Sequence, residues 1–103
     1  MNKSTNVVTL ETLSCSAGWR NYYFVKVVTD DGVVGWSEFD EGFGSPGVGA
    51  VIKQLAPRII GQSVMRHERI REDLYCTTRP GAGGVVGQAL GAIENALLDA
   101  KAK

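Results

Sequence analysis

The sequence lacks the features that mark several large classes of protein. Its 11 basic residues balance its 11 acidic ones, so the formal net charge is zero. A nucleic-acid-binding surface or a polybasic membrane-binding surface needs a basic excess. No apolar run approaches the roughly 18 residues of a transmembrane helix, and residues 1–13 lack the apolar stretch of a signal peptide. These absences predict a cytoplasmic protein that binds neither nucleic acid nor membrane.

Cysteine and histidine are also scarce. Cys15 and Cys76 have no CxxC spacing and no secretory context, so we expect two reduced thiols, with Cys76 buried or half-buried rather than nucleophilic. The one histidine, His67, excludes a His-rich metal site. Because it stands beside Glu68 in a charged segment, we expect it on the surface. The sequence therefore predicts no catalytic residues and no metal site within these 103 residues.

Three segments in the first half of the chain have strand character. Residues 7–13 alternate, residues 22–29 are rich in aromatic and β-branched side chains, and residues 33–39 follow a turn at Asp31-Gly32. Consecutive strands joined in this way form an antiparallel meander. The small polar segment Ser14–Asn21 is predicted to be the loop between the first two strands.

The second half has helical character. Ser45-Pro46 predicts a helix start, with serine as N-cap and proline in the first turn, and Pro57 disfavours its continuation. A second helix is expected from near Ser63 through residue 75, and an apolar stripe over 86–100 predicts a third. The predicted fold class is α+β in a single domain, 1–103, with a three-stranded antiparallel β-meander followed by a helical bundle.

The glycine-rich run over residues 79–91, RPGAGGVVGQALG, invites a nucleotide-loop interpretation. The GxGxxG fingerprint fails in every register, since Val86 stands where the third glycine should fall when counting from Gly81. A phosphate loop also needs a lysine, and residues 80–100 contain none. We interpret the run as a helix start, and we expect Gly87 and Gly91, four residues apart, to let a neighbouring element approach closely.

The order of these pieces resembles the N-terminal capping domain of the enolase superfamily, in its mandelate racemase/muconate lactonizing enzyme branch. The pieces are FVKVVTDDGVVGWSEF, LAPRIIG, RIREDLY and QALGAIENALLDAKAK, and the resemblance covers about residues 7–103. Any one piece is weakly specific for the family. Their order and spacing together are fairly specific. The resemblance implies the enolase N-terminal domain-like fold.

In that family the capping domain precedes a (β/α)7β barrel, of which no motif can be matched in this sequence. The barrel carries the carboxylates that bind Mg²⁺ and the acid/base groups that abstract the proton α to a carboxylate. A barrel adds roughly 250 residues. The resemblance therefore implies a parent lyase or isomerase, acting as a dehydratase, racemase or cycloisomerase on a small carboxylate or acid-sugar substrate. The barrel, in cis or in trans, would bind the Mg²⁺. Residues 1–103 alone would bind no Mg²⁺ and be inactive, and the parent is expected to be a homo-oligomer.

Two loops of the family's capping domain close over the barrel mouth, and by position they match Ser14–Asn21 and Phe39–Ser45. We expect the two to lie side by side, because Tyr22 and Phe39 fall at the same end of the second hairpin. The substrate-specificity residues implied by the resemblance are Trp19, Arg20, Asn21, Phe39, Glu41 and Phe43.

Two questions stay open at the level of sequence. Trp19 can wall a substrate and Arg20 can pair with a carboxylate, but Trp19 can equally be an apolar anchor and Arg20 a solvated side chain. The alternative to a capping domain is a free-standing interaction module with the same fold and no chemistry. An exposed apolar surface favours the capping domain, and a fully polar surface favours the module.

Overall fold

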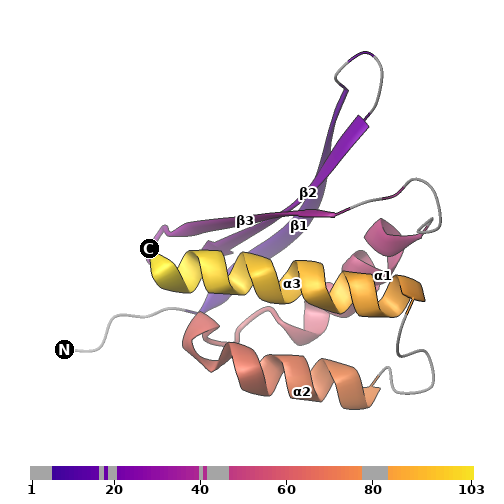
Figure 1. Ribbon diagram of the computed structural model, residues 1–103. Coiled ribbons are helices and arrows are strands. Elements are labelled where there is room, and N and C mark those ends of the chain that lie inside the picture. The colour runs from indigo at the N-terminus through magenta and orange to yellow at the C-terminus, as the bar shows by residue number, and fades with distance from the viewer. Residues whose placement is uncertain (1–5, 17, 19–20, 40, 42–46, 78–83) are drawn as a thin grey trace.

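A three-stranded antiparallel sheet lies on one long helix, and two shorter helices pack against the other sides of that helix (Figure 1). The computed structural model describes residues 6–16, 18, 21–39, 41, 47–77 and 84–103. The elements are β1 (Val7–Ser16), β2 (Asn21–Thr29), β3 (Val34–Phe39), α1 (Val48–Leu55), the short 3₁₀ helices η1 (Ala56–Arg58) and η2 (Val64–Arg66), α2 (His67–Thr77) and α3 (Gly84–Ala102). The predicted fold class is confirmed.

The sheet has the order β1-β2-β3, as a meander requires. The turn between β2 and β3 is closed by a hydrogen bond from Gly32 N to Thr29 O at 3.0 Å, and Gly32 has φ 86°, a value that favours glycine. The predicted loop, Ser14–Asn21, is longer than the connection between β1 and β2 in the structure. Ser14–Ser16 continue β1, because their backbone groups pair with Asn21–Tyr23 of β2.

One of the two predicted helix starts differs in the structure and the other is confirmed. The N-cap of α1 is Gly47, so the prediction of Ser45 as N-cap was wrong. Ser63 does cap the next helical segment, since its Oγ accepts a hydrogen bond from Met65 N at 3.2 Å at the start of η2. Ser45 itself lies outside the described residues.

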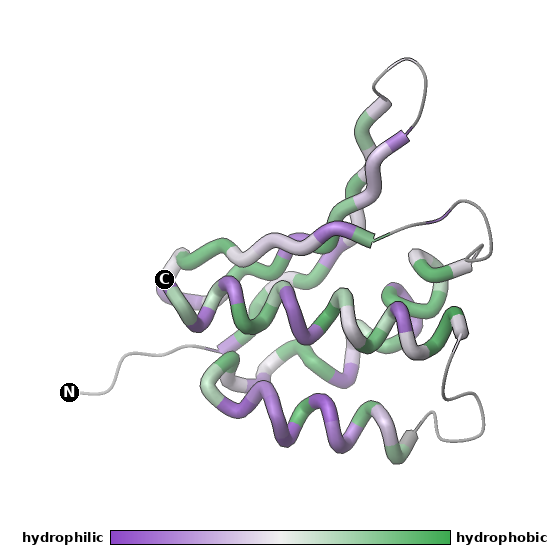
Figure 2. The backbone as a smooth tube through the Cα atoms, in the orientation of Figure 1, coloured by the Kyte–Doolittle hydropathy of each residue, from purple (hydrophilic) through white to green (hydrophobic). Residues whose placement is uncertain are grey.

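α2 is mainly hydrophilic along its length (Figure 2) and buries a narrow stripe. The stripe consists of His67, Ile70 and Leu74, spaced three and four residues apart. The expectation that His67 is a surface residue was therefore wrong, because its helical position faces α3 rather than solvent. Cys76, expected to be buried or half-buried, is exposed.

α3 forms the centre of the core, as its apolar stripe predicts. It contacts β2 and β3 on one side and α1 and α2 on others. The buried residues of α3 are Ala89, Leu90, Ala92, Ile93, Ala96, Leu97 and Ala100. Four of the seven are alanines, and the small side chains let the sheet approach the helix closely.

The closest approach of sheet and helix is at Gly35 of β3. A Cβ atom at this position would lie 2.7 Å from Ala100 Cβ and would clash with the carbonyl oxygen of Ala96. The expected close contact at Gly87 and Gly91 was wrong for the described part of the chain, where a Cβ on either residue would meet no atom within 4 Å. Helical spacing correctly put the two glycines on one face, but no described element covers that face.

The outer edge of β3 is bonded to α3 by polar side chains. Asp99 Oδ2 accepts a hydrogen bond from Trp36 N at 2.8 Å, and Lys103 Nζ donates one to Val34 O at 2.9 Å. Lys103 also pairs with Asp99 at 3.1 Å, and Ser37 Oγ donates to Ala92 O at 2.6 Å. These bonds satisfy backbone groups that an edge strand otherwise leaves open to pairing with another chain.

The contact at Gly35 gives a matched pair of glycine variants. Gly35→Ala should lower the free energy of unfolding by about 2 kcal/mol or more, because backbone atoms of α3 leave no room for a methyl group. Gly91→Ala should leave it unchanged or raise it by up to about 1 kcal/mol, since alanine favours a helix over glycine. Urea denaturation of the 103-residue chain measures both. Equal effects would show that the sheet and helix do not touch at Gly35.

The Asp99 carboxylate should make stability depend on pH. The hydrogen bond from the Trp36 backbone, followed by the bond to Lys103, lowers the pKa of Asp99 below its usual 3.8. A carboxyl group whose pKa is lowered by folding contributes stability above its unfolded pKa and loses that contribution as the pH falls through its folded pKa. The stability difference between wild type and Asp99→Asn should therefore narrow in denaturation titrations as the pH falls through 3.8 and below it. A difference that stays constant over this range would exclude the ionised carboxylate as its source.

Candidate functional site

The β1–β2 hairpin extends past the end of β3 (Figure 1). β3 ends at Phe39, opposite Tyr23, whereas β1 and β2 continue to the pair Ser16–Asn21. The chain therefore turns over the hairpin tip and leaves β3 at the same end of the sheet. We expected Tyr22, near the start of β2, and Phe39, at the end of β3, to lie at the same end of the second hairpin. The pairing of Tyr23 with Phe39 confirms this. Residues 19–20 and 42–46 of the connecting segments lie outside the described part of the chain.

The predicted site residues take different positions at this end. Asn21 is exposed at the start of β2. Phe39 is buried in the core, with its ring centroid 5.7 Å from that of Tyr23. Glu41 is half-buried beside the start of α1. Phe39 thus belongs to the core, and Glu41 lies against α1. The other predicted residues, Trp19, Arg20 and Phe43, lie outside the described residues.

Glu41 holds the first turn of α1. Its Oε1 accepts a hydrogen bond from Gly47 N at 2.7 Å, and its Oε2 accepts one from Gly49 N at 2.9 Å. A carboxylate at this position satisfies amide groups that the helix leaves unpaired and interacts favourably with the positive end of the helix dipole. Both ends of the segment 42–46 are thereby fixed to α1. Sequence reasoning favoured Ser45 because a glutamate six residues before an N-cap is not a known capping pattern.

A hollow lies between the inner face of the hairpin and α1. Thr12, Ser14 and Tyr23 line it from the sheet, and Lys53 lines it from the helix. One ammonium group beside several hydroxyl groups can bind an anionic or hydroxyl-rich compound. Sequence reasoning missed Thr12 and Lys53. The alternation of Thr12 and Ser14 along β1 was a signal for the shared face, but nothing local placed Lys53 near them.

No group of three or more His, Cys, Asp or Glu side chains within the described residues is arranged to hold a metal ion. These residues therefore do not fit the Mg²⁺ that the family resemblance implies, and no reaction step can be assigned to a metal on them. Among the same residues, no helix is long and apolar enough to cross a membrane.

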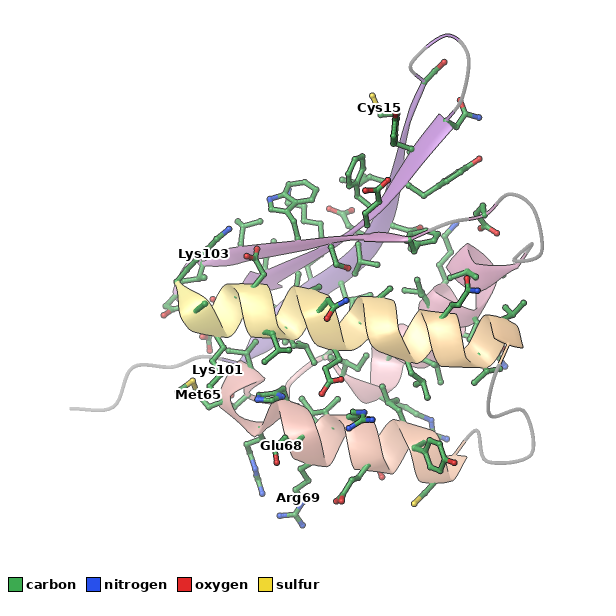
Figure 3. The ribbon with its side chains drawn as sticks, viewed as in Figure 1. Cys15, Met65, Glu68, Arg69, Lys101 and Lys103 are labelled. Atoms are coloured by element: carbon green, nitrogen blue, oxygen red, sulfur yellow. The ribbon has the colours of Figure 1, made fainter. Side chains whose placement is uncertain are left out.

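A polar cluster around the buried His67 joins α2 to α3 on the side away from the hairpin (Figure 3). His67 Nδ1 lies 3.7 Å from Glu94 Oε2, and His67 Nε2 lies 3.4 Å from Lys101 Nζ. Arg71 Nε pairs with the other oxygen of Glu94 at 3.4 Å. Lys101 and Lys103, both exposed at the end of α3, turn to opposite sides: Lys101 Nζ reaches His67 and Lys103 Nζ reaches β3. The cluster connects two helices and is remote from the hollow.

Comparison with known proteins identifies the family. The profile described as "Mandelate racemase / muconate lactonizing enzyme, N-terminal domain" matches residues 4–103. This chain belongs to that family. A D-galactonate dehydratase family member from Streptomyces bingchenggensis (strain BCW-1) is 30% identical over 99% of this chain and 25% of its own length. The D-galactonate dehydratase of Pectobacterium atrosepticum is 33% identical over 80% of this chain and 22% of its own length.

Solved structures show the same fold, one of them at much higher identity. A candidate L-alanine-DL-glutamate epimerase from Burkholderia xenovorans strain LB400, bound to magnesium and fumarate, is 68% identical with a TM-score of 0.93 over 96% of this chain. A mandelate racemase/muconate lactonizing protein from Paracoccus denitrificans PD1222, complexed with magnesium, is 30% identical with a TM-score of 0.84 over 93% of this chain. The aligned residues make up 25% and 27% of those chains. This domain of the mandelate racemase/muconate lactonizing enzyme family thus spans about a quarter of the relatives that it matches.

The carboxylate of Glu41 should be needed for the start of α1. Glu41→Ala should lower the free energy of unfolding by about 1 kcal/mol, the usual cost of losing a helix cap. Glu72→Ala, which removes an exposed carboxylate from the middle of α2, is the matched control and should change it by less than about 0.5 kcal/mol. Chemical denaturation followed by circular dichroism measures both. If the two variants lose the same stability, the bonds from Gly47 and Gly49 to Glu41 contribute nothing.

Proposed function

We propose that this chain is the capping domain of a Mg²⁺-dependent lyase or isomerase that abstracts the proton α to the carboxylate of a small acid or acid-sugar substrate. The domain closes the mouth of a (β/α)7β barrel and shapes its substrate pocket. The observation that carries this proposal is the strand register, which brings the hairpin tip and the segment after β3 to one end of the sheet. Family membership over residues 4–103 supports it.

The roles of the capping domain and the barrel are assigned from the side chains that the described residues contain. They include no metal-binding group of side chains and no paired acid and base at the hollow. We therefore assign Mg²⁺, which stabilises an enediolate when bound, and the acid/base groups to the barrel, in cis or in trans. The magnesium in both solved relatives and the names of the dehydratase relatives are consistent with this assignment. Residues 1–103 without a barrel should be inactive.

Within the domain, the predicted specificity residues have two roles. We propose that Trp19, Arg20, Asn21 and Phe43 face the substrate from the two segments. Phe39 and Glu41 act indirectly, because one is buried in the core and the other is bonded to the first turn of α1. Loops carried on a rigid sheet are common positions for specificity residues.

Family membership, and not the surface, favours a capping domain over a free-standing module. Large apolar side chains are exposed singly on several elements, whereas a docking surface is marked by one contiguous apolar patch. The exposed residues are Val8, Leu13, Trp36, Ile60, Met65, Tyr75 and Leu98. We further propose that the parent protein is cytoplasmic and forms a homo-oligomer.

The proposal is tested with the protein at its natural length, assayed with Mg²⁺ against a panel of acid sugars and other small α-proton-bearing carboxylates. Trp19→Ala should change the order of preferred substrates or raise KM by about tenfold, because it removes a wall of the pocket. Tyr75→Ala on α2, which also removes an exposed ring, is the control and should leave both unchanged.

Two results would contradict the proposal. An absence of Mg²⁺-dependent turnover on every substrate would remove the enzymatic function. A Trp19→Ala protein that unfolds while its remaining folded fraction keeps the original specificity would make Trp19 a core anchor.

A further inference from the structure

Among the described residues, His67 is the one buried side chain that can carry a charge. It lies at the start of α2 and is only 8% exposed. Its Nδ1 atom is buried and forms no hydrogen bond with any described residue. A buried polar atom without a partner costs free energy, so its presence in a folded domain calls for an explanation.

The neighbours of the His67 ring determine which of its nitrogens carries the proton. Nε2 lies 3.4 Å from Lys101 Nζ, and an ammonium group donates hydrogen bonds but cannot accept them. Nε2 of the neutral ring is therefore the acceptor, and the proton is on Nδ1. Nδ1 lies 3.7 Å from Glu94 Oε2, which is too far for a hydrogen bond. The ring thus stands between a positive and a negative charge, both supplied by α3.

The other charged side chains near the ring do not bond to it within the described part of the chain. Arg71, one turn further along α2, reaches His67 only through Glu94, since it pairs with the other carboxylate oxygen at 3.4 Å. Glu68 points away from α3 (Figure 3). Arg66, at the end of η2, is exposed. Lys101 and Glu94 are therefore the two groups that respond directly to a change of charge on the ring.

The side chain of Lys101 has a second environment beside it. Lys101 is exposed, and it lines a hollow together with Lys103 and with Asp31 from the turn after β2. Lys103 is held elsewhere, by its bond to Val34 O. Because a carboxylate lines the same hollow, an ammonium group that leaves the ring stays close to a negative charge.

We propose that the contact between Lys101 and His67 is a pH-sensitive clasp, which joins the last turn of α3 to the start of α2. While His67 is neutral, Nε2 accepts the bond from Lys101. When the ring takes up a second proton, Nε2 holds that proton and can no longer accept, and two positive charges repel each other. Lys101 then leaves the ring, and the protonated ring forms an ion pair with Glu94 through Nδ1. Acidification therefore exchanges Lys101 for Glu94 as the partner of His67.

The exchange takes place where histidine ordinarily changes its charge, between about pH 5 and about pH 8. Lysine and glutamate side chains ordinarily keep their charges over this range. The bond from Lys101 favours the neutral ring, so its contribution to stability is present at the higher pH and is lost as the pH falls. The pair with Glu94 favours the protonated ring and behaves in the opposite way. The clasp belongs to the domain itself and does not depend on the enzymatic activity proposed above.

Two variants with opposite pH dependences test the clasp, in urea denaturation of the 103-residue chain at about pH 8 and about pH 5. Lys101→Met should raise the unfolding constant about threefold at the higher pH, and should lower it or leave it unchanged at the lower pH. Glu94→Gln should have an effect at least about threefold larger at the lower pH. The loss of the pair between Glu94 and Arg71 adds the same amount at both.

The controls separate the clasp from a general effect of charge. Lys103→Met removes the other lysine at this end of α3, which bonds to β3, so its effect should be the same at both pH values. In a His67→Gln background, the effects of Lys101→Met and Glu94→Gln should lose their pH dependence. Circular dichroism shows whether each variant is folded.

Nitrogen NMR gives a second readout that needs no variant of the clasp. His67 is the one histidine of the 103 residues, so a histidine-labelled chain gives the signals of a single ring, and at the higher pH the proton should be on Nδ1. If the isolated chain does not fold, the same spectrum is recorded on the protein at its natural length, where the signals of His67 are those that His67→Gln removes.

Either of two results would overturn the proposal. A proton on Nε2 at the higher pH would show that the ring does not accept a bond from Lys101. An effect of Lys101→Met that is equal at both pH values would show that the contact is indifferent to the charge of His67.

Discussion

The close contact between β3 and α3 determines where everything else lies. At Gly35 the strand has no side chain, and at Ala96 and Ala100 the helix has only methyl groups, so backbone meets backbone with almost no material between. Such an interface fixes the position of the strand on the helix, because a close-packed contact leaves no free volume for either to shift. α1 and α2 then pack on the remaining sides of the same helix.

This arrangement closes one face and one edge of the sheet. One face of the sheet is occupied by α3, and the β3 edge is bonded to Asp99 and Lys103, so the sheet cannot extend by adding a strand there. β1 is the other edge strand of the sheet. In the described residues its backbone is bonded outside the sheet at Val7, to Gly61 and Gln62, so most of this edge is open to pairing, unlike the β3 edge.

Most of the fold could be predicted from local patterns, and the exceptions have identifiable physical causes. Alternation and helical spacing predicted three strands and three helices, because each period reports a buried face. Ser14–Ser16 were expected in a loop, since small polar residues show no such period, yet backbone pairing with β2 makes them a strand. His67 carried a usable signal, being three and seven residues from Ile70 and Leu74, but its charged neighbour Glu68 outweighed it.

The candidate site was less predictable than the fold. The two segments could be brought together from the hairpin register alone, without any knowledge of side chains. The roles of Phe39 and Glu41 could not be predicted, because they depend on tertiary contacts. No local rule relates a glutamate to a helix that begins seven residues later. For the same reason Lys53 and Thr12, adjacent only in space, were missed.

The projecting hairpin has a mechanical consequence. Beyond the Tyr23–Phe39 pair, the sheet narrows to two strands, and the last pairs join Cys15 to Tyr22 and Ser16 to Asn21. A two-stranded ribbon twists more than a wider sheet, and it can open locally without exposing the core. These last pairs contribute no residue to the buried core, so substitutions at Cys15, Ser16, Asn21 and Tyr22 can alter this end of the domain while the contact at Gly35 stays intact.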